Sequence, residues 1–243
     1  MTERPWISFV VPCFNEEENV AATVTSARSA MPPDRDYEII LVDDCSTDHT
    51  LERMRVLAST DPCIKVVHNP VNLSLGGSYK VGVAFARGQY VIMIPGDDGF
   101  PTQAIREIFR HAGQADMVIP FAANPGVRSW FRALASKVFV ALLNCIFWLD
   151  VKYYNGAVLH RTDVLRSIEI RTNGFAYQAE ALVKLIAGGA SYLHCRVEIR
   201  ERAAGRSSAL SRKNLITVWK TIVNLLVDVG LFRKFRMRGP WGN

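Results

Sequence analysis

Three apolar, β-branched runs in the N-terminal part of the chain each stop abruptly at acidic or small polar residues. The runs are VVPCFNEEENV at 10–20, IILVDDCSTDHT at 39–50 and YVIMIPGDDGFP at 90–101. Such runs are typical of buried strands in a parallel sheet, whose carboxyl ends form the crevice where ligands bind. We therefore expect three pairs of residues to converge at one sheet edge: Asn15 and Glu16, Asp43 and Asp44, Asp97 and Asp98. Clustered carboxylates repel one another, so the edge should hold a divalent cation, sugar hydroxyls or nucleotide N–H groups.

Strand-like and helix-like segments alternate along the first half, which predicts an α/β fold with a mainly parallel sheet flanked by helices. We predict strands at 7–11, 38–42, 64–68, 90–94 and 117–120, and helices at 17–30, 48–58, 78–87 and 102–111. Asn15 is a candidate cap for the first helix. The second half predicts an apolar helix at 129–149, a helix carrying Glu180 within 174–187, a strand at 191–198, a basic loop at 200–212 and an amphipathic helix at 213–235.

Charge is distributed unevenly between the two halves. Residues 1–120 carry 10 basic and 16 acidic residues, whereas residues 121–243 carry 19 and 7. The acidic half holds the predicted carboxylate cluster. The basic half favours an anionic partner such as a phosphate, a lipid head group or nucleic acid.

The five cysteines are an odd number, are widely spaced and form no CxxC pair. This pattern favours reduced thiols in a cytosolic protein over disulfides or a zinc site. The N-terminal apolar stretch ends in a proline and a polar run, so we do not expect a signal peptide. No uncharged apolar window reaches the roughly 18–20 residues that a membrane span needs.

The three runs occur together with GGSYKVGVAFARGQYVIMIPGDD, which leads into the third of them. In this order the motifs resemble those of the GT-A-fold family 2 glycosyltransferases, and more narrowly the dolichol-phosphate mannose synthase group, which glycosylates polyprenyl phosphates. The segment GFAYQAEALVKLIAGGASYLHCRVEIRERAAGRSS is similar to that group's acidic helix, strand and Arg-x-x-Gly-x-Ser loop. The resemblance covers roughly residues 7–215 and implies a GT-A domain at 1–212. Residues 1–124 would form its nucleotide-sugar half, 125–212 its acceptor half, and 213–243 a basic amphipathic helix and tail.

The resemblance implies a role for each matching position. Pro12, Asn15 and Glu16 would line the base and ribose pocket, with Gly96 beside them. Asp43 and Asp44 would contact the uracil or guanine base and the ribose. Asp97 would hold Mg²⁺ or Mn²⁺ between the donor phosphates, and Arg202 and Ser207 would meet phosphate on the acceptor side.

Two positions depart from the family pattern. Pro95-Gly96-Asp97 stands where the family usually has Asp-x-Asp, so the first Asp is missing and Asp98 follows instead. Asp97 and Asp98 could share the metal, or one carboxylate with the diphosphate and waters could suffice, as Mg²⁺ accepts. Asn155-Gly156-Ala157 stands where relatives often show Ser-Gly-Phe-Arg. The lipid-phosphate site would then be built differently.

The acceptor decides which protein groups the chemistry needs. A phosphate acceptor is already anionic and needs cations, which Arg128, Arg132, Arg202 and Arg206 could supply. A sugar hydroxyl needs a carboxylate base, for which Glu180 is the best candidate. We therefore keep Glu180 and Arg202 among the catalytic candidates with Asp97 and Asp98.

The helices at 129–149 and 213–235 are apolar with basic edges, which favours contact with an anionic membrane surface. The sequence thus predicts an inverting, metal-dependent hexosyltransferase that uses a nucleotide-diphosphate sugar at the cytoplasmic membrane face. A small membrane-protein partner is compatible with this prediction. Nucleic acid is not, because the basic residues are interleaved with apolar helices.

Simpler interpretations of the same residues remain open. Asp43 and Asp44 could cap a helix, Asp97 and Asp98 could form a plain turn, and Glu180 could be an exposed helix residue. The basic loop could be solvated, and both apolar helices could pack in the core. Gly76-Gly77 suits close packing better than a phosphate loop. Two other functions also remain: transfer to a saccharide hydroxyl, or a non-catalytic nucleotide-sugar or membrane-binding module.

Overall fold

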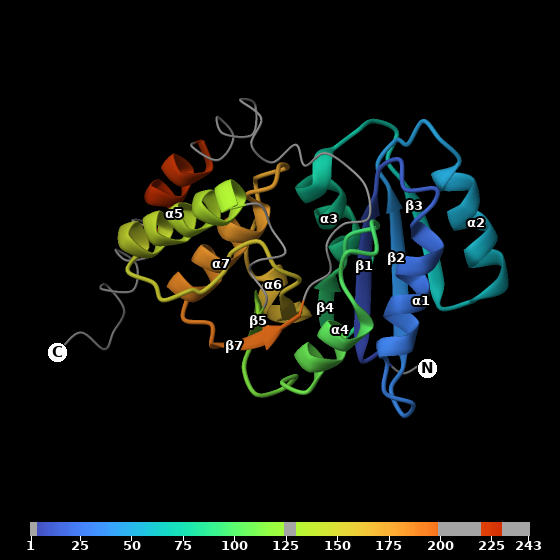
Figure 1. The fold of residues 1–243 in the computed structure, drawn as a ribbon, viewed down its shortest axis with the longest axis horizontal. Coiled ribbons are helices and arrows are strands. Elements are labelled where there is room, and N and C mark those ends of the chain that lie inside the picture. The colour runs from blue at the N-terminus through green and yellow to red at the C-terminus, as the bar shows by residue number, and fades with distance from the viewer. Residues whose placement is uncertain (1–3, 124–129, 199–219, 230–243) are drawn as a thin grey trace.

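The computed structural model describes residues 4–123, 130–198 and 220–229, with the side chains of the fifth helix described from Leu134 onward (Figure 1). The strands are β1 (Ile7–Cys13), β2 (Tyr37–Asp43), β3 (Ile64–His68), β4 (Tyr90–Met93), β5 (Met117–Ala122), β6 (Leu159–Arg161) and β7 (Tyr192–Val197). The helices are α1 (Val20–Ala30), α2 (Thr50–Thr60), α3 (Ser74–Phe85), α4 (Thr102–Phe109), α5 (Trp130–Phe147), α6 (Thr162–Arg166) and α7 (Tyr177–Ala187). Residues 220–229 form a further helix.

The strands form one seven-stranded sheet in the order β3-β2-β1-β4-β6-β5-β7. β1 pairs in parallel with β2 on one side and with β4 on the other, with Cys13 opposite Asp43. Only β6 runs antiparallel to its neighbours in this sheet of the described chain. The prediction of a mainly parallel sheet is confirmed.

The sheet buries an apolar core on each of its faces. Alternate residues of β1 point to opposite sides, so Phe9 and Val11 join one core and Val10 joins the other. Helices α1, α2 and α4 cover the first core, and α3, α5, α7 and residues 220–229 cover the second (Figure 1). This three-layer arrangement leaves the strand ends and their loops as the places where polar groups gather.

Several predicted elements differ from those observed. α1 begins at Val20, so the prediction that Asn15 caps it is wrong. The Asn15 side chain instead accepts a hydrogen bond from Thr47 N on the neighbouring loop. α3 begins at Ser74, which puts Gly76-Gly77 inside its first turn rather than before it. The short elements β6 and α6 were not predicted, because a three-residue strand carries too little pattern.

The C-terminal helix packs on the core through one of its faces. Ile222, Leu225 and Val229 recur at three- and four-residue spacing and are buried in the core that α7 also lines. The predicted boundary at residue 212 stays a prediction, since residues 199–219 lie outside the described part. Among the helices of the described chain, none has both the length and the apolar character to cross a membrane.

A buried polar pair joins α7 to the sheet. His160 on β6 is fully buried, and its Nε2 lies 3.0 Å from Nε2 of Gln178. Burial lowers the pKa of His160 from 6.5 to about 3, and its Nδ1 has no hydrogen-bond partner among the described residues. The folded protein therefore holds this imidazole neutral.

This burial predicts loss of stability in acid. The unfolded chain protonates His160 below its pKa of 6.5, whereas the folded chain resists protonation down to about 3. The contribution of neutral His160 to the free energy of unfolding is therefore complete above pH 6.5. It falls as the pH drops through this window, and roughly 2 kcal/mol is lost at about pH 5. Urea unfolding of wild type and His160→Gln at neutral pH and about pH 5 checks this, and the variant should lose roughly 2 kcal/mol less on acidification. An equal loss in both proteins would refute it.

Candidate active site at the carboxyl edge of the sheet

The predicted convergence of carboxylates is centred on Cys13, the last residue of β1. Burial is the largest cause that raises the pKa of this thiol, and the nearby carboxylates of Glu16, Asp43, Asp97 and Asp48 raise it further. Three of these four were predicted to meet here. A thiol held protonated in this way is a poor nucleophile, so Cys13 fills space at the edge.

Gly96 holds the loop after β4 against the end of β1. Its N–H donates to Pro12 O at 3.3 Å, and its carbonyl accepts the Thr23 hydroxyl at 2.9 Å. A Cβ atom at this position would lie 2.5 Å from Cys13 Sγ. Only glycine therefore lets the two strand ends come this close, which brings Asp97 beside the edge of β1.

Asp43 and Asp44, at and just after the end of β2, are buried and hydrogen-bonded within the edge. Asp43 Oδ2 lies 2.7 Å from His68 Nδ1, and Asp44 Oδ1 accepts from Asn69 Nδ2 at 3.0 Å and from Leu73 N at 2.8 Å. Neither carboxylate caps the helix that follows. That alternative is wrong, because Asp48 accepts the Thr50 N–H at the start of α2.

The loops that follow β1 and β2 interlock. Asn15 N donates to Ser46 Oγ at 3.1 Å, Asn15 Oδ1 accepts from Thr47 N at 2.8 Å, and Glu16 N donates to Thr50 Oγ1 at 2.8 Å. These contacts fix the loop that carries Glu16. Asn15 therefore fixes the loop after β1 against the loop after β2.

Left-handed backbone accompanies each of the three strand ends. Asn15, Cys45 and Asp98 have φ of 57°, 62° and 48°. Non-glycine residues in this region are uncommon and gather at functional sites. Their occurrence after β1, β2 and β4 supports a site at this edge.

Asp97 and Asp98 differ in their surroundings. Asp98 Oδ1 accepts the Ser26 hydroxyl of α1 at 2.8 Å, and Asp98 N donates to Thr23 Oγ1 at 3.0 Å. Asp97 Oδ1 accepts the Gly99 N–H at 3.1 Å, and the negative charge of its carboxylate helps to raise the pKa of the Cys13 thiol. Asp97 therefore belongs to the edge, and Asp98 anchors the loop to α1.

The donor set at this edge suits a cation that takes most of its ligands from a substrate. Within the described ranges, no three His, Cys, Asp or Glu side chains form a group that could hold a metal. Mg²⁺ is usually held by one or two carboxylates together with phosphates and waters. Asp97 fits that arrangement as the protein ligand.

Glu180 on α7 is buried, so the interpretation as an exposed helix residue is wrong. It accepts hydrogen bonds from Arg171 N at 2.9 Å, Thr172 N at 2.8 Å and Lys184 Nζ at 2.6 Å. Burial raises the pKa of Glu180, but these donors outweigh it and hold the pKa below its ordinary value. A base should have a pKa near the working pH, so these contacts favour a structural role.

Most of the predicted acceptor side lies outside the described residues. Arg128, Arg202, Arg206 and Ser207 are among these. Arg132 belongs to α5, but its side chain is not described. Their roles stay predictions.

Phe14 was not predicted as a site residue from the sequence, although it follows the buried strand β1 directly. The residue is 48% exposed and directly follows Cys13, which lies opposite the buried Asp43. An exposed aromatic ring at this position is suited to stack on a planar base. The signal in the sequence was a large aromatic residue placed between a strand end and Asn15.

Gly76-Gly77 permits close packing, as expected. A Cβ on Gly76 would lie 2.7 Å from Tyr177 Cβ, and the N–H groups of both glycines donate to Asn173 O. These amides are therefore already engaged and do not form a phosphate loop.

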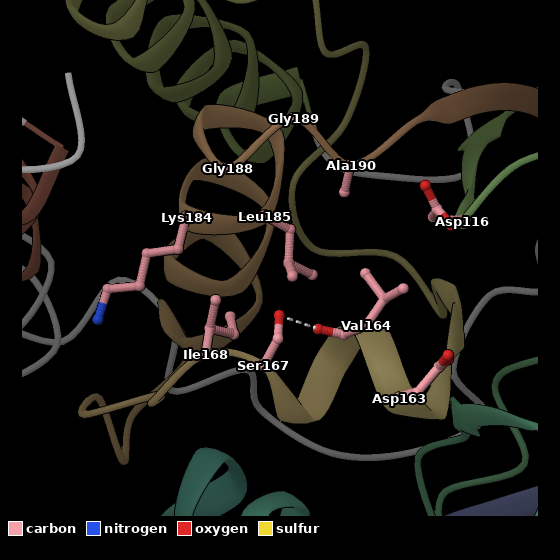
Figure 2. Close-up of a pocket in the computed structure, with 10 residues that line it drawn as sticks. All are labelled: Asp116, Asp163, Val164, Ser167, Ile168, Lys184, Leu185, Gly188, Gly189 and Ala190. Carbon is pink, nitrogen blue, oxygen red and sulfur yellow. Dashed lines mark hydrogen bonds between the residues drawn. The ribbon is translucent and has the colours of Figure 1, made fainter. Parts of the chain in front are cut away.

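A separate pocket of about 420 Å³ lies at the other end of the sheet (Figure 2). Asp116 and Ala190 precede β5 and β7, and Val164 follows the antiparallel β6. These are the amino ends of the parallel strands. In Figure 2 the ammonium group of Lys184 points away from the pocket. The pocket is therefore distinct from the carboxylate edge.

Comparison with known proteins decides the family. Residues 8–170 match the family described as Glycosyl transferase family 2, which is more than half of the chain. The chain belongs to glycosyltransferase family 2. The carboxylate edge is thus the candidate active site of a glycosyltransferase.

Curated relatives include three enzymes named for polyprenyl phosphates. The undecaprenyl-phosphate mannosyltransferase of Micrococcus luteus is 24% identical over 82% of this chain and 85% of its own length. The undecaprenyl-phosphate 4-deoxy-4-formamido-L-arabinose transferase of Edwardsiella ictaluri is 25% identical over 92% and 66%. The dolichol-phosphate mannosyltransferase of Pyrococcus furiosus is 26% identical over 73% and 52%. The chain spans about two thirds and half of the length of the last two.

Solved structures show the same fold. Glucosyl-3-phosphoglycerate synthase from Mycobacterium tuberculosis, in complex with uridine diphosphate, is similar with a TM-score of 0.69 and 19% identity, covering 93% of this chain and 80% of that one. The same enzyme with Mn²⁺, UDP-glucose and phosphoglyceric acid gives a TM-score of 0.67 at 19% identity, covering 89% and 79%. The GT-A fold expected from the sequence is confirmed.

Glu180→Gln tests the structural role of this carboxylate in the transferase. We expect an unchanged pH profile of glycosyl transfer and no rescue by added formate, because the residue does not accept the reacting proton. Loss of its charged hydrogen bonds should lower the unfolding free energy by roughly 1–3 kcal/mol. A dead but stable variant that formate restores would instead identify Glu180 as the base.

Proposed function

We propose that this protein is an inverting glycosyltransferase that moves a hexose from a nucleoside diphosphate sugar to a polyprenyl phosphate at the cytoplasmic face of a membrane. The observation that carries the proposal is the convergence of Glu16, Asp43 and Asp97 around the end of β1 in a family 2 chain. The relatives named above act on polyprenyl phosphates, which supports this acceptor class.

On the donor side, Phe14 and Asp43 would contact the base, and Glu16 would face the ribose. Asp97 would hold Mg²⁺ or Mn²⁺ against the diphosphate, with Asp98 fixing the loop from α1. A divalent cation there supplies the positive charge that stabilises the leaving diphosphate. The synthase that shares this fold was crystallised with Mn²⁺ and UDP-glucose, which supports this use of the edge.

On the acceptor side, a phosphate oxygen would form the new bond to the anomeric carbon of the sugar. The bond from that carbon to the donor phosphate oxygen breaks, and the electron pair leaves with the nucleoside diphosphate. A phosphate is already anionic at neutral pH and needs no strong base, in keeping with the engagement of Glu180. Arg128, Arg132, Arg202 and Ser207 remain the proposed phosphate contacts.

Transfer of a radiolabelled sugar from UDP- or GDP-hexose in the presence of polyprenyl phosphate tests the reaction class. The proposal expects label in a product that partitions into organic solvent and is released by mild acid. Label found only in water-soluble saccharide would favour a hydroxyl acceptor. Donor turnover absent with every nucleotide sugar would favour a non-catalytic binding module.

Asp97→Asn should abolish most metal-dependent transfer, because it removes the proposed protein ligand of the cation. Losses of this kind commonly reach about 10²–10³-fold when charge stabilisation of the leaving group is removed. Asp98→Asn should reduce activity less and should mainly lower the melting temperature, since Asp98 bonds to Ser26. Initial rates with and without EDTA measure both effects. Near-normal turnover of the Asp97 variant, or of wild type in EDTA, would contradict the metal site.

An exposed apolar surface supports the proposed membrane contact. Its side chains are Leu134, Val138 and Leu142 on α5, Trp148 directly after it, and Val223, Leu226 and Val227 on the helix 220–229. Both elements lie at the same end of the molecule, away from α2 (Figure 1). Lys137 and Lys220 are exposed on the same helices. Apolar residues with basic neighbours suit an anionic bilayer interface.

Replacing Val223, Leu226 and Val227 together by serine should release the protein from phosphatidylglycerol vesicles. These side chains are exposed, so the core contacts of Ile222 and Leu225 remain. Val56→Ser on α2 is the matched control, because Val56 is 61% exposed at the opposite end and should not affect binding. Vesicle sedimentation measures the bound fraction.

The basic residues beyond the described helix supply a second arm of this test. Arg233, Lys234, Arg236 and Arg238 should each contribute about 1 kcal/mol at an anionic surface. Their joint replacement by glutamine, or raised salt with wild type, should therefore also release the protein. Equal sedimentation of all variants with neutral and anionic vesicles would contradict the membrane surface.

A further inference from the structure

Lys184 is a buried lysine whose ammonium group makes two hydrogen bonds and two ion pairs. Its side chain is 5% exposed, and Nζ donates to Glu180 Oε1 at 2.6 Å and to Glu169 O at 2.8 Å. The third partner is Asp228 Oδ2 at 3.0 Å. The ammonium group therefore has a partner on α7, on the segment before α7 and on the helix 220–229.

The same carboxylates also bind the segment 169–173. Glu180 accepts the N–H groups of Arg171 and Thr172, and Asp228 Oδ1 receives Arg171 Nη1 at 3.2 Å. The Asp228 side chain is only 12% exposed. Buried charges are tolerated when they are paired and hydrogen-bonded, so these groups hold one another in place. We call Glu180, Lys184 and Asp228 the latch.

The segment held by the latch in turn caps α3. Asn173 O accepts the first-turn N–H groups of Gly76 at 2.7 Å and Gly77 at 3.2 Å. Asn173 Oδ1 accepts Lys80 Nζ at 2.5 Å. These amides would otherwise lack partners at the helix start. A shift of Asn173 would therefore move the beginning of α3.

The beginning of α3 is hydrogen-bonded to Asp44 at the carboxylate edge. Leu73 N donates to Asp44 Oδ1 at 2.8 Å, and Asn72 Nδ2 donates to Asp44 O at 3.2 Å. Asn69 Nδ2 bridges Asp44 Oδ1 and Ser78 Oγ, at 3.0 and 2.9 Å. Asp44 follows Asp43 directly, so an uninterrupted series of bonds connects the C-terminal helix to the carboxylate edge.

We infer that Lys184 and Asp228 are positioning residues for the nucleotide site, and that they make the C-terminal helix part of it. The inference rests on the proposed function, because the carboxylate edge is taken as the site of the nucleoside diphosphate. Neither residue touches that edge; they act by holding segment 169–173 against α3. Breaking the latch should therefore weaken nucleotide binding as well as stability.

Titration calorimetry with Mn²⁺-UDP and Mn²⁺-GDP measures this effect. Asp228→Asn and Lys184→Met should weaken binding of the nucleotide that wild type prefers by about 3–30-fold, the range typical of residues that act at a distance. Asp228→Glu keeps the charge and should recover most of the affinity. Each variant is measured well below its own melting temperature, where circular dichroism shows it folded.

Leu165→Ala is the control for loss of stability alone. Leu165 is buried in the same core, on α6, and takes part in none of the hydrogen bonds or ion pairs of the latch described above. It should lower the melting temperature and leave nucleotide affinity unchanged. If Asp228→Asn and Lys184→Met also bind nucleotide like wild type, the latch is only structural and the inference is wrong.

Hydrogen exchange separates this inference from the proposed function. Asp228→Asn should speed exchange at the amides of Leu73, Gly76 and Gly77, relative to the amide of Val66 on β3. Unchanged exchange at these three amides would overturn the inference whatever the ligand is. A wild-type protein with slow exchange there that binds neither nucleotide would instead contradict the proposed donor.

Discussion

Strand β1 is paired on both of its edges, and its register with β2 and β4 decides where the acidic residues meet. Cys13 lies opposite Asp43, and Gly96 packs on the Cys13 thiol with no room for a side chain. A shift of one residue along β1 would exchange its side chains between the two cores and would move Cys13 away from Asp43. The carboxylate edge therefore depends on the same packing that stabilises the sheet.

The sequence was most informative where a buried element ends in polar residues. The apolar runs before Asn15, Asp43 and Asp97 located three strand ends correctly, because a parallel sheet places such ends at one edge. It was also informative at Gly76-Gly77, where close packing was the better interpretation. Ile64–His68 was predicted with the bounds observed. These features are local, so short-range patterns suffice to find them.

Features that depend on distant partners could not be predicted in this way. Asn15 looked like a helix cap, but its side chain bonds to a loop 32 residues away. Glu180 looked like a candidate base, yet it is paired with Lys184 inside a mostly apolar helix. That i, i+4 pair among apolar residues was the available signal of a buried ion pair. Its second partner, Asp228, is known only once the C-terminal helix is placed.

Diffraction from crystals soaked with Mn²⁺ and UDP or GDP tests the central claim most directly. The account predicts an anomalous Mn²⁺ peak in coordination contact with the Asp97 carboxylate, with the diphosphate bound to it and the base beside Phe14 and Asp43. Mn²⁺ and nucleotide bound instead at the amino ends of the strands, in the pocket beside Asp116, would contradict it.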